Sequence, residues 1–115
     1  MVKLLLRLEG LAIFIVAAIL YRTFGYNWLI FALLILTPDI SMLGFLRGKK
    51  FGTILYNLIH TYVLVIIVVT AGLMTGQKWL LAYGFILLAH IGIDRFLGLG
   101  LKYPTGFKDT HLQKV

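Results

Sequence analysis

Residues 51–73 read FGTILYNLIHTYVLVIIVVTAGL, a run without a single Asp, Glu, Lys or Arg. A helix that crosses the hydrocarbon core of a bilayer needs about 20 consecutive, mainly apolar residues. This run is long enough to do so, and it still carries Asn57 and His60 near its start. It therefore predicts a membrane-spanning helix with polar side chains in one half.

Three further stretches have the same character, at residues 4–21, 28–46 and 79–97. Tryptophan begins two of them, as is typical of residues at the boundary between lipid and water. The turns between the stretches are short, and short turns join helices that run antiparallel. The sequence thus predicts an all-α integral membrane protein. Its architecture would be a four-helix up-down-up-down bundle in which residues 1–115 form one transmembrane domain with a tail at 98–115.

The composition agrees with a membrane protein. The 115 residues are 61% hydrophobic and 13% charged, with a mean hydropathy of +0.98, whereas soluble domains average about 25% charged residues. The chain has no cysteine, which excludes disulfides and thiolate metal ligands. The net charge of +7 is spread over the ends of the predicted spans. We therefore expect contact with anionic membrane lipids and no binding of nucleic acid.

The basic residues also predict the orientation of the chain. Only Arg22 and Lys78 fall on one side of the predicted bundle. The other side carries Lys3, Arg7, Arg47, Lys49, Lys50, Arg95, Lys102, Lys108 and Lys114. Because cytoplasmic loops carry the excess of Lys and Arg, both termini are predicted to be cytoplasmic.

Ionisable residues inside the spans are the strongest indication of function. A carboxylate in a span costs about 2.5–3.5 kcal/mol on insertion scales, and such residues usually face a bundle interior and serve function. In the predicted topology the polar residues all fall in the cytoplasmic half. Helical spacing brings Asn57 and His60 onto one face, and His90 and Asp94 onto another. The full set is Glu9, Asp39, Asn57, His60, His90 and Asp94.

A weak internal repeat supports a common depth for these residues. A shift of 51 positions places Trp28 on Trp79, and it places Glu9 on His60 and Asp39 on His90. Two hairpins inserted the same way round would be related by a pseudo-two-fold axis along the membrane normal. The repeat predicts that these ionisable groups surround that axis.

Imidazoles and carboxylates at one depth suit a divalent metal such as Zn, Mn or Fe. The predicted ligands are Asp39, His60, His90 and Asp94. Glu9, Asp109 and His111 are predicted to be catalytic, with Glu9 as general base or a further ligand. A substrate with an anionic group would be bound by Asn57, Arg95, Lys102 and Lys108. The alternative is that each histidine only forms a buried hydrogen bond to a carboxylate.

Several motifs in the chain match a known family. Pro38 to Gly44, Tyr56 to Tyr62, Leu88 to Arg95 and Gly100 to Leu112 resemble a bacterial family of small four-span membrane proteins that is catalogued only as a domain of unknown function. The resemblance covers nearly the whole chain. It implies a multi-pass protein of the bacterial inner membrane and supplies no activity.

A fainter similarity runs to the membrane-bound metal-dependent hydrolases of the YdjM type. It rests on the order Pro38-Asp39, His60-Thr61 and His90 to Asp94, followed by Gly100 and Pro104. Ser41 stands where that pattern tends to have a second acid, and Tyr56-Asn57 replaces its basic pair. With fewer ligands, the site would be mononuclear or decayed.

Three functions follow from these patterns, and whether the chain is an enzyme stays open among them. The first is a membrane-embedded metal-dependent enzyme, hydrolase-like, acting on an amphiphilic or phosphorylated substrate at the cytoplasmic leaflet. The second is a small proton-coupled exporter that works as a homodimer and uses Glu9. The third is a haem protein with His60 and His90 as axial ligands.

Overall fold

The computed structural model describes residues 2–98, apart from the side chain of Phe45. This part of the chain is helical and contains no strand. Its elements are α1 (Val2–Thr23), α2 (Trp28–Leu34), the 3-10 helix η1 (Thr37–Leu46), α3 (Lys49–Ile59), α4 (Tyr62–Thr75) and α5 (Lys78–Phe96). The predicted all-α class is therefore confirmed for the described residues.

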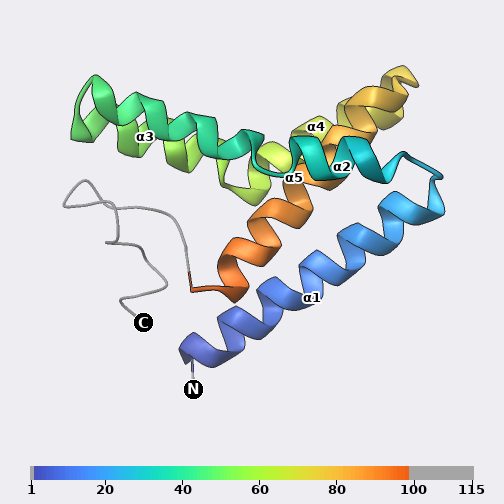
Figure 1. The fold of residues 1–115 in the computed structure, drawn as a ribbon, viewed down its shortest axis with the longest axis horizontal. Coiled ribbons are helices and arrows are strands. Elements are labelled where there is room, and N and C mark those ends of the chain that lie inside the picture. Colours follow the sequence, from blue (N-terminus) through green and yellow to red (C-terminus); the bar gives the residue numbers. More distant parts are fainter. Residues whose placement is uncertain (1, 99–115) are drawn as a thin grey trace.

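Helices α1 and α5 form the most extensive contact of the fold and run antiparallel (Figure 1). Gly10 and Gly92 lie where they touch. A Cβ atom built on Gly92 would stand 2.7 Å from the Phe14 nitrogen and 2.8 Å from the Gly10 oxygen. Small residues allow two helix backbones to approach this closely. Near the same end, Arg7 Nε donates to the Phe96 carbonyl at 2.7 Å.

Helix α5 is the central element, because α4 packs on it as well as α1. Its buried residues run from Leu81 to Gly92, and Ile86 and Ile91 are almost fully enclosed. Close approach again uses glycine: a Cβ on Gly72 of α4 would stand 2.8 Å from the Leu81 nitrogen. α5 therefore offers a rigid, enclosed base for any side chain it carries.

Pro38 changes the winding of the second apolar stretch. Helix α2 ends at Leu34, and η1 then continues to Leu46 as a 3-10 helix. Proline has no N–H for the helix ladder, and it disfavours α conformation in the residue before it. A 3-10 helix repeats every three residues, and Pro38, Ser41 and Gly44 are buried at this spacing. The small side chains on this stripe face α3.

Helices η1 and α3 form an antiparallel hairpin that extends away from α1 and α5 (Figure 1). A Cβ on Gly44 would stand 3.3 Å from the Gly52 Cα. After α3 the chain bends by 46° at residues 60–61 and continues as α4. Both the α2–η1 and the α3–α4 stretches are thus broken partway along.

Aromatic side chains fill the opposite end of the molecule, where the turns before α2 and before α5 lie together. Tyr21 is fully buried, and its ring lies 5.4 Å from that of Tyr26 and 5.1 Å from those of Trp28 and Phe31, measured between centroids. Its hydroxyl donates to the Asn27 carbonyl at 2.5 Å. Rings with polar atoms suit a boundary between lipid and water.

The helices compare with the expected spans as follows. α1 and α5 are each long and apolar enough to cross a membrane, and α3 with α4 makes a third candidate if the bent pair is one span. The expected span at 28–46 is instead divided into α2 and η1. The up-down-up-down bundle, the single domain over 1–115 and the cytoplasmic termini stay predictions.

Because α1 and α5 approach so closely, we expect one methyl group added at Gly92 to lower the stability of the fold markedly. Gly92→Ala would push its new Cβ against backbone atoms of α1, which cannot move aside as a side chain can. We expect destabilisation of about 1–3 kcal/mol, typical of overpacking, measured as a lower Tm in detergent. Ala32→Leu, which adds volume at an exposed position of α2, serves as the control. Equal melting temperatures for Gly92→Ala and the wild type would contradict the close approach.

Candidate metal centre

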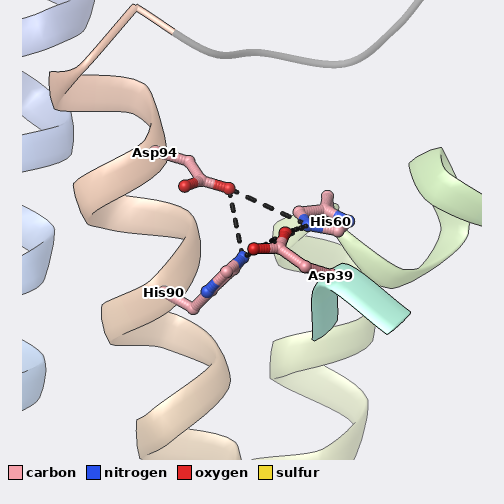
Figure 2. Close-up of side chains that lie close together, drawn as sticks. All are labelled: Asp39, His60, His90 and Asp94. Carbon is pink, nitrogen blue, oxygen red and sulfur yellow. Dashed lines mark hydrogen bonds and ion pairs between the residues drawn. The ribbon is translucent and has the colours of Figure 1, made fainter. Parts of the chain in front are cut away.

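Four ionisable side chains from three segments meet at one point inside the fold (Figure 2). Asp39 comes from η1, His60 from the bend between α3 and α4, and His90 and Asp94 from successive turns of α5. Each offers one ligand atom, and the four atoms lie within 4.8 Å of one another. The sequence predicted these same four residues as metal ligands.

Five of the six separations between the ligand atoms are close to the edges of a tetrahedron, and the sixth, between Asp39 and Asp94, is at most 4.8 Å. Asp39 Oδ1 lies 3.3 Å from His60 Nε2 and 3.2 Å from His90 Nε2, and the two Nε2 atoms are 3.3 Å apart. Asp94 Oδ2 lies 3.1 Å from His90 Nε2 and 3.8 Å from His60 Nε2. Zinc bonds of about 2.0–2.1 Å at tetrahedral angles would separate ligand atoms by about 3.3–3.4 Å. The cluster could therefore hold a metal ion with little rearrangement.

The tautomer of both histidines is set by backbone carbonyls. His60 Nδ1 lies 2.9 Å from the Tyr56 oxygen, and His90 Nδ1 lies 2.6 Å from the Ile35 oxygen. A carbonyl only accepts, so each Nδ1 must carry the proton. In a neutral ring Nε2 then presents its lone pair. A hydrogen bond of this kind behind the ligating nitrogen is usual for metal-binding histidine.

Pro38 explains why the Ile35 carbonyl is available to accept a hydrogen bond from His90. Pro38 has no N–H to donate to the carbonyls of Leu34 or Ile35, and the N–H of Asp39 bonds to Leu36 instead. The Thr37 hydroxyl satisfies the Leu34 oxygen at 2.7 Å, and His90 satisfies Ile35. The helix break thus orients one ligand and places Asp39, the next residue, beside it.

His60 is held by the second break in a similar way. It is the C-cap of α3, and its backbone N–H and its Nδ1 both bond to the Tyr56 carbonyl. The Tyr56 ring stacks on the imidazole, with centroids 3.8 Å apart and planes 11° apart. Thr61 then begins α4 by accepting from the Val63 N–H. These contacts leave His60 little freedom to turn.

The electrostatics of the cluster favour a positive charge at its centre. When both rings are neutral, each Nε2 presents a lone pair. The two Nε2 atoms and the two carboxylate oxygens are then all acceptors. The alternative of hydrogen-bonded His–Asp pairs would require a proton on at least one Nε2, which makes that ring an imidazolium because its Nδ1 already carries a proton. A divalent cation satisfies all four groups at once, and buried charges are normally paired or bound to metal.

The cluster is enclosed on three sides and open on the fourth. The side chains of His60 and His90 are 4% and 2% exposed and that of Asp94 is 14% exposed, whereas Asp39 is 47% exposed. A structural zinc site is closed, but a catalytic one keeps a position for water or substrate. Access to this centre would be on the side of Asp39.

The other predicted site residues are placed less centrally. Glu9 is exposed on α1 and lines a different cavity. Asn57 is partly buried one turn before His60 and is not one of the four. Arg95 follows Asp94 and contacts the backbone of His60 at 3.5 Å. Lys102, Lys108, Asp109 and His111 lie outside the described residues.

Sequence reasoning did not identify the groups that orient the ligands. The Ile35 carbonyl and Tyr56 have no chemical motif of their own. A signal did exist for Ile35, because a proline in an apolar run leaves a carbonyl three or four residues earlier without its N–H partner. Nothing in the sequence indicates that His90, 55 positions later, provides the replacement.

The comparison with protein families agrees with the motifs. A family model described as Domain of unknown function (DUF4260) matches residues 3–115. The chain belongs to this family. The DUF4260 match confirms the predicted relationship to a domain of unknown function, while the similarity to metal-dependent hydrolases stays a prediction. No curated protein and no solved structure matches the chain.

Metal analysis tests the centre directly. Protein purified without chelator should contain about one zinc, manganese or iron ion per chain, measured by inductively coupled plasma mass spectrometry. His60→Ala and His90→Ala should each lose most of it, because each removes a ligand. The third histidine provides a matched control, and His111→Ala should retain the metal. Metal should also be released as the pH falls, because binding requires neutral imidazole. The same metal content in all four proteins would exclude the centre.

The role of the helix break predicts an effect of Pro38 on metal affinity. Pro38→Ala supplies an N–H that can bond to the Ile35 carbonyl, so His90 Nδ1 loses its exclusive acceptor. Loss of such an orienting contact typically costs about 10–100-fold in metal affinity, measurable by competition with a fluorescent zinc chelator. Pro104→Ala, the chain's other proline, should leave the affinity unchanged. An unaltered affinity in Pro38→Ala would show that the break does not orient His90.

Proposed function

We propose that this protein is a membrane-embedded, metal-dependent enzyme of hydrolase type that acts on an amphiphilic or phosphorylated substrate at the cytoplasmic leaflet. The observation that carries the proposal is the convergence of His60, His90 and two carboxylates, whose ligand atoms all lie within 4.8 Å of one another. Zinc suits this ligand set best, with manganese or iron as alternatives.

An enzyme explains the uneven exposure of the ligands better than a purely structural metal does. A metal that only held the helices together would favour four enclosed ligands. Here Asp39, in the broken part of the second apolar stretch, is half-exposed. Its carboxylate lies where water and substrate would reach the centre. If His60, His90 and Asp94 held the metal and Asp39 left it, the fourth position would be open to water, and Asp39 could accept a proton from that water.

The only reactants of the proposed reaction are water and an ester of the substrate. A divalent ion in this centre would lower the pKa of a water molecule and so supply a nucleophile at neutral pH. The attacking water adds its oxygen to the phosphoryl or acyl group, and the bond from that group to the alcohol oxygen breaks. The proton removed from water leaves with the alcohol. His60 and His90, fixed by their carbonyl partners, would hold the geometry.

The proposed setting is the inner membrane of a bacterium, with four spans and both termini in the cytoplasm. The contact between Arg7 and Phe96 supports a common side for the start of α1 and the end of α5. The turns before α2 and before α5 line one cavity at the other end, which supports antiparallel spans. The partners would be membrane lipids and, as one arrangement, a second copy of the chain.

Hydrolysis in proteoliposomes tests the proposal. Wild-type protein loaded with zinc would be incubated with phosphatidic acid, phosphatidylethanolamine or an alkyl phosphate, and released phosphate or head group measured. We expect turnover with at least one substrate, loss on chelation and recovery on addition of zinc. His90→Ala should be at least 100-fold slower, because an oriented ligand is removed.

Arg22→Gln, at the end of α1 farthest from Arg7, provides a control that should keep full turnover. Hydrolysis that persists undiminished in His90→Ala would contradict the proposal. So would a zinc-loaded protein that is inert toward all three substrates.

A further inference from the structure

A second cavity lies between α1, α4 and α5, beside the metal centre and separate from its ligands. It has a volume of about 320 Å³. Its lining combines two opposite charges with apolar and small residues: Leu6, Glu9, Gly10, Ala12, Ile13, Tyr62 and Arg95. None of the four candidate metal ligands is among them, so this cavity has its own chemistry.

The close contact between α1 and α5 brings the two charges to the same cavity. A Cβ on Gly10 would stand 2.5 Å from the Arg95 Cβ, so α1 lies directly against the base of the Arg95 side chain. Glu9 precedes this contact and is exposed at the edge of the cavity. An arginine and a carboxylate therefore approach from two helices.

Arg95 is held in place from the cavity wall. Its guanidinium carbon lies 5.3 Å from the centre of the Tyr62 ring, within the range of a cation–π interaction. One of its nitrogens donates to the His60 carbonyl at 3.5 Å. The planar fork of donors in a guanidinium suits a carboxylate or phosphate.

Glu9 has no such support from the described chain. Within residues 2–98, the ion pairs of 4.0 Å or less join only histidines to Asp39 or Asp94. The helix that carries Glu9 has a mean hydropathy of 2.2 over its most apolar window, and a carboxylate there is costly unless something compensates it. A cationic group of a ligand would do so.

The cavity lies near the start of α1 and the end of α5, within reach of the head groups that would surround these helix ends. Glu9 lies about 10 Å from the start of α1 at 1.5 Å per residue, and Arg95 is next to the last residue of α5. Leu6, Ala12 and Ile13 provide an apolar wall along α1, and Ala12 is exposed. A chain attached to the bound head group could therefore continue along α1 into lipid.

We propose that this cavity binds a zwitterionic head group, with its phosphate or carboxylate on Arg95 and its ammonium on Glu9, while the attached hydrocarbon chain lies along α1. The ligand class is an amphiphile with a primary amine and an anionic group, of which phosphatidylethanolamine is the simplest membrane example. The contact of Arg95 with the His60 backbone places the anionic end on the side of the metal centre. The binding of this head group does not depend on the metal. The further claim that the bound lipid is the enzyme's substrate rests on the proposed function.

Native mass spectrometry of the detergent-solubilised full chain tests the specificity. The probes are phosphatidylethanolamine, phosphatidylglycerol, a cationic lipid without phosphate, and soluble glycerophosphoethanolamine. Wild type should bind phosphatidylethanolamine about tenfold more tightly than phosphatidylglycerol, because a charge-assisted hydrogen bond is gained. Weaker binding of glycerophosphoethanolamine would show that the hydrocarbon chain contributes, and equal binding would show a site for the free head group.

Variants separate the two charges. Glu9→Gln should reduce phosphatidylethanolamine binding to the level of phosphatidylglycerol, and Arg95→Gln should weaken both. Arg47→Gln provides a matched control, because Arg47 also lies over an aromatic ring, at 4.9 Å from that of Phe51, but lines another cavity. If Arg95→Gln is unstable, Arg95→Lys keeps the charge and should lose part of the affinity for both lipids.

Two results would overturn the inference. One is equal affinity of the wild type for phosphatidylethanolamine and phosphatidylglycerol. The other is preferred binding of the cationic lipid that is lost in Glu9→Gln, which would indicate a cation or proton site as in an exporter. The metal content of the same samples keeps the two proposals apart: lipid specificity that survives in metal-free His60→Ala would support the cavity even if the metal centre fails.

Discussion

The hydrogen bond from His90 Nδ1 to the Ile35 carbonyl links the backbone of one broken helix to the most enclosed helix of the fold. A carbonyl freed at membrane depth must be satisfied by protein or by water in a cavity. Pro38 frees that carbonyl, and α5 supplies the donor. The same contact fixes the proton on Nδ1 and directs Nε2 at Asp39. Local backbone chemistry and the geometry of the centre therefore depend on one another.

The second break follows the same physical rule at a different place. Tyr56 accepts both from the His60 N–H at the end of α3 and from the His60 ring. In each case a helix terminus provides the acceptor and an imidazole provides the donor. Two interruptions that would each be costly in lipid become the supports of one cluster. This arrangement explains why Asp39 and His60 lie at the ends of helices.

The sequence predicted the helical class, the approximate helix positions and the four clustered ionisable residues, because these depend on hydropathy, helical spacing and the cost of burying charge. It did not predict the 3-10 winding of residues 37–46 or the bend at His60, because both depend on contacts between segments. Even so, Pro38, Ser41 and Gly44 recur every three residues, a spacing that matches the repeat of a 3-10 helix such as η1. Glu9 was grouped with the cluster on its depth and on the weak internal repeat, and depth does not distinguish the two sides of α5.

The ten residues of η1 have a consequence for how the second apolar stretch fits a bilayer. A 3-10 helix rises about 2.0 Å per residue and an α-helix about 1.5 Å. Winding residues 37–46 in the tighter form therefore lengthens the stretch by about 5 Å. Residues 28–46 then reach about 33 Å, which exceeds a hydrocarbon thickness of about 30 Å. If this stretch crosses the membrane, its excess length would be accommodated by tilting. The η1–α3 hairpin is inclined relative to α1 and α5 (Figure 1).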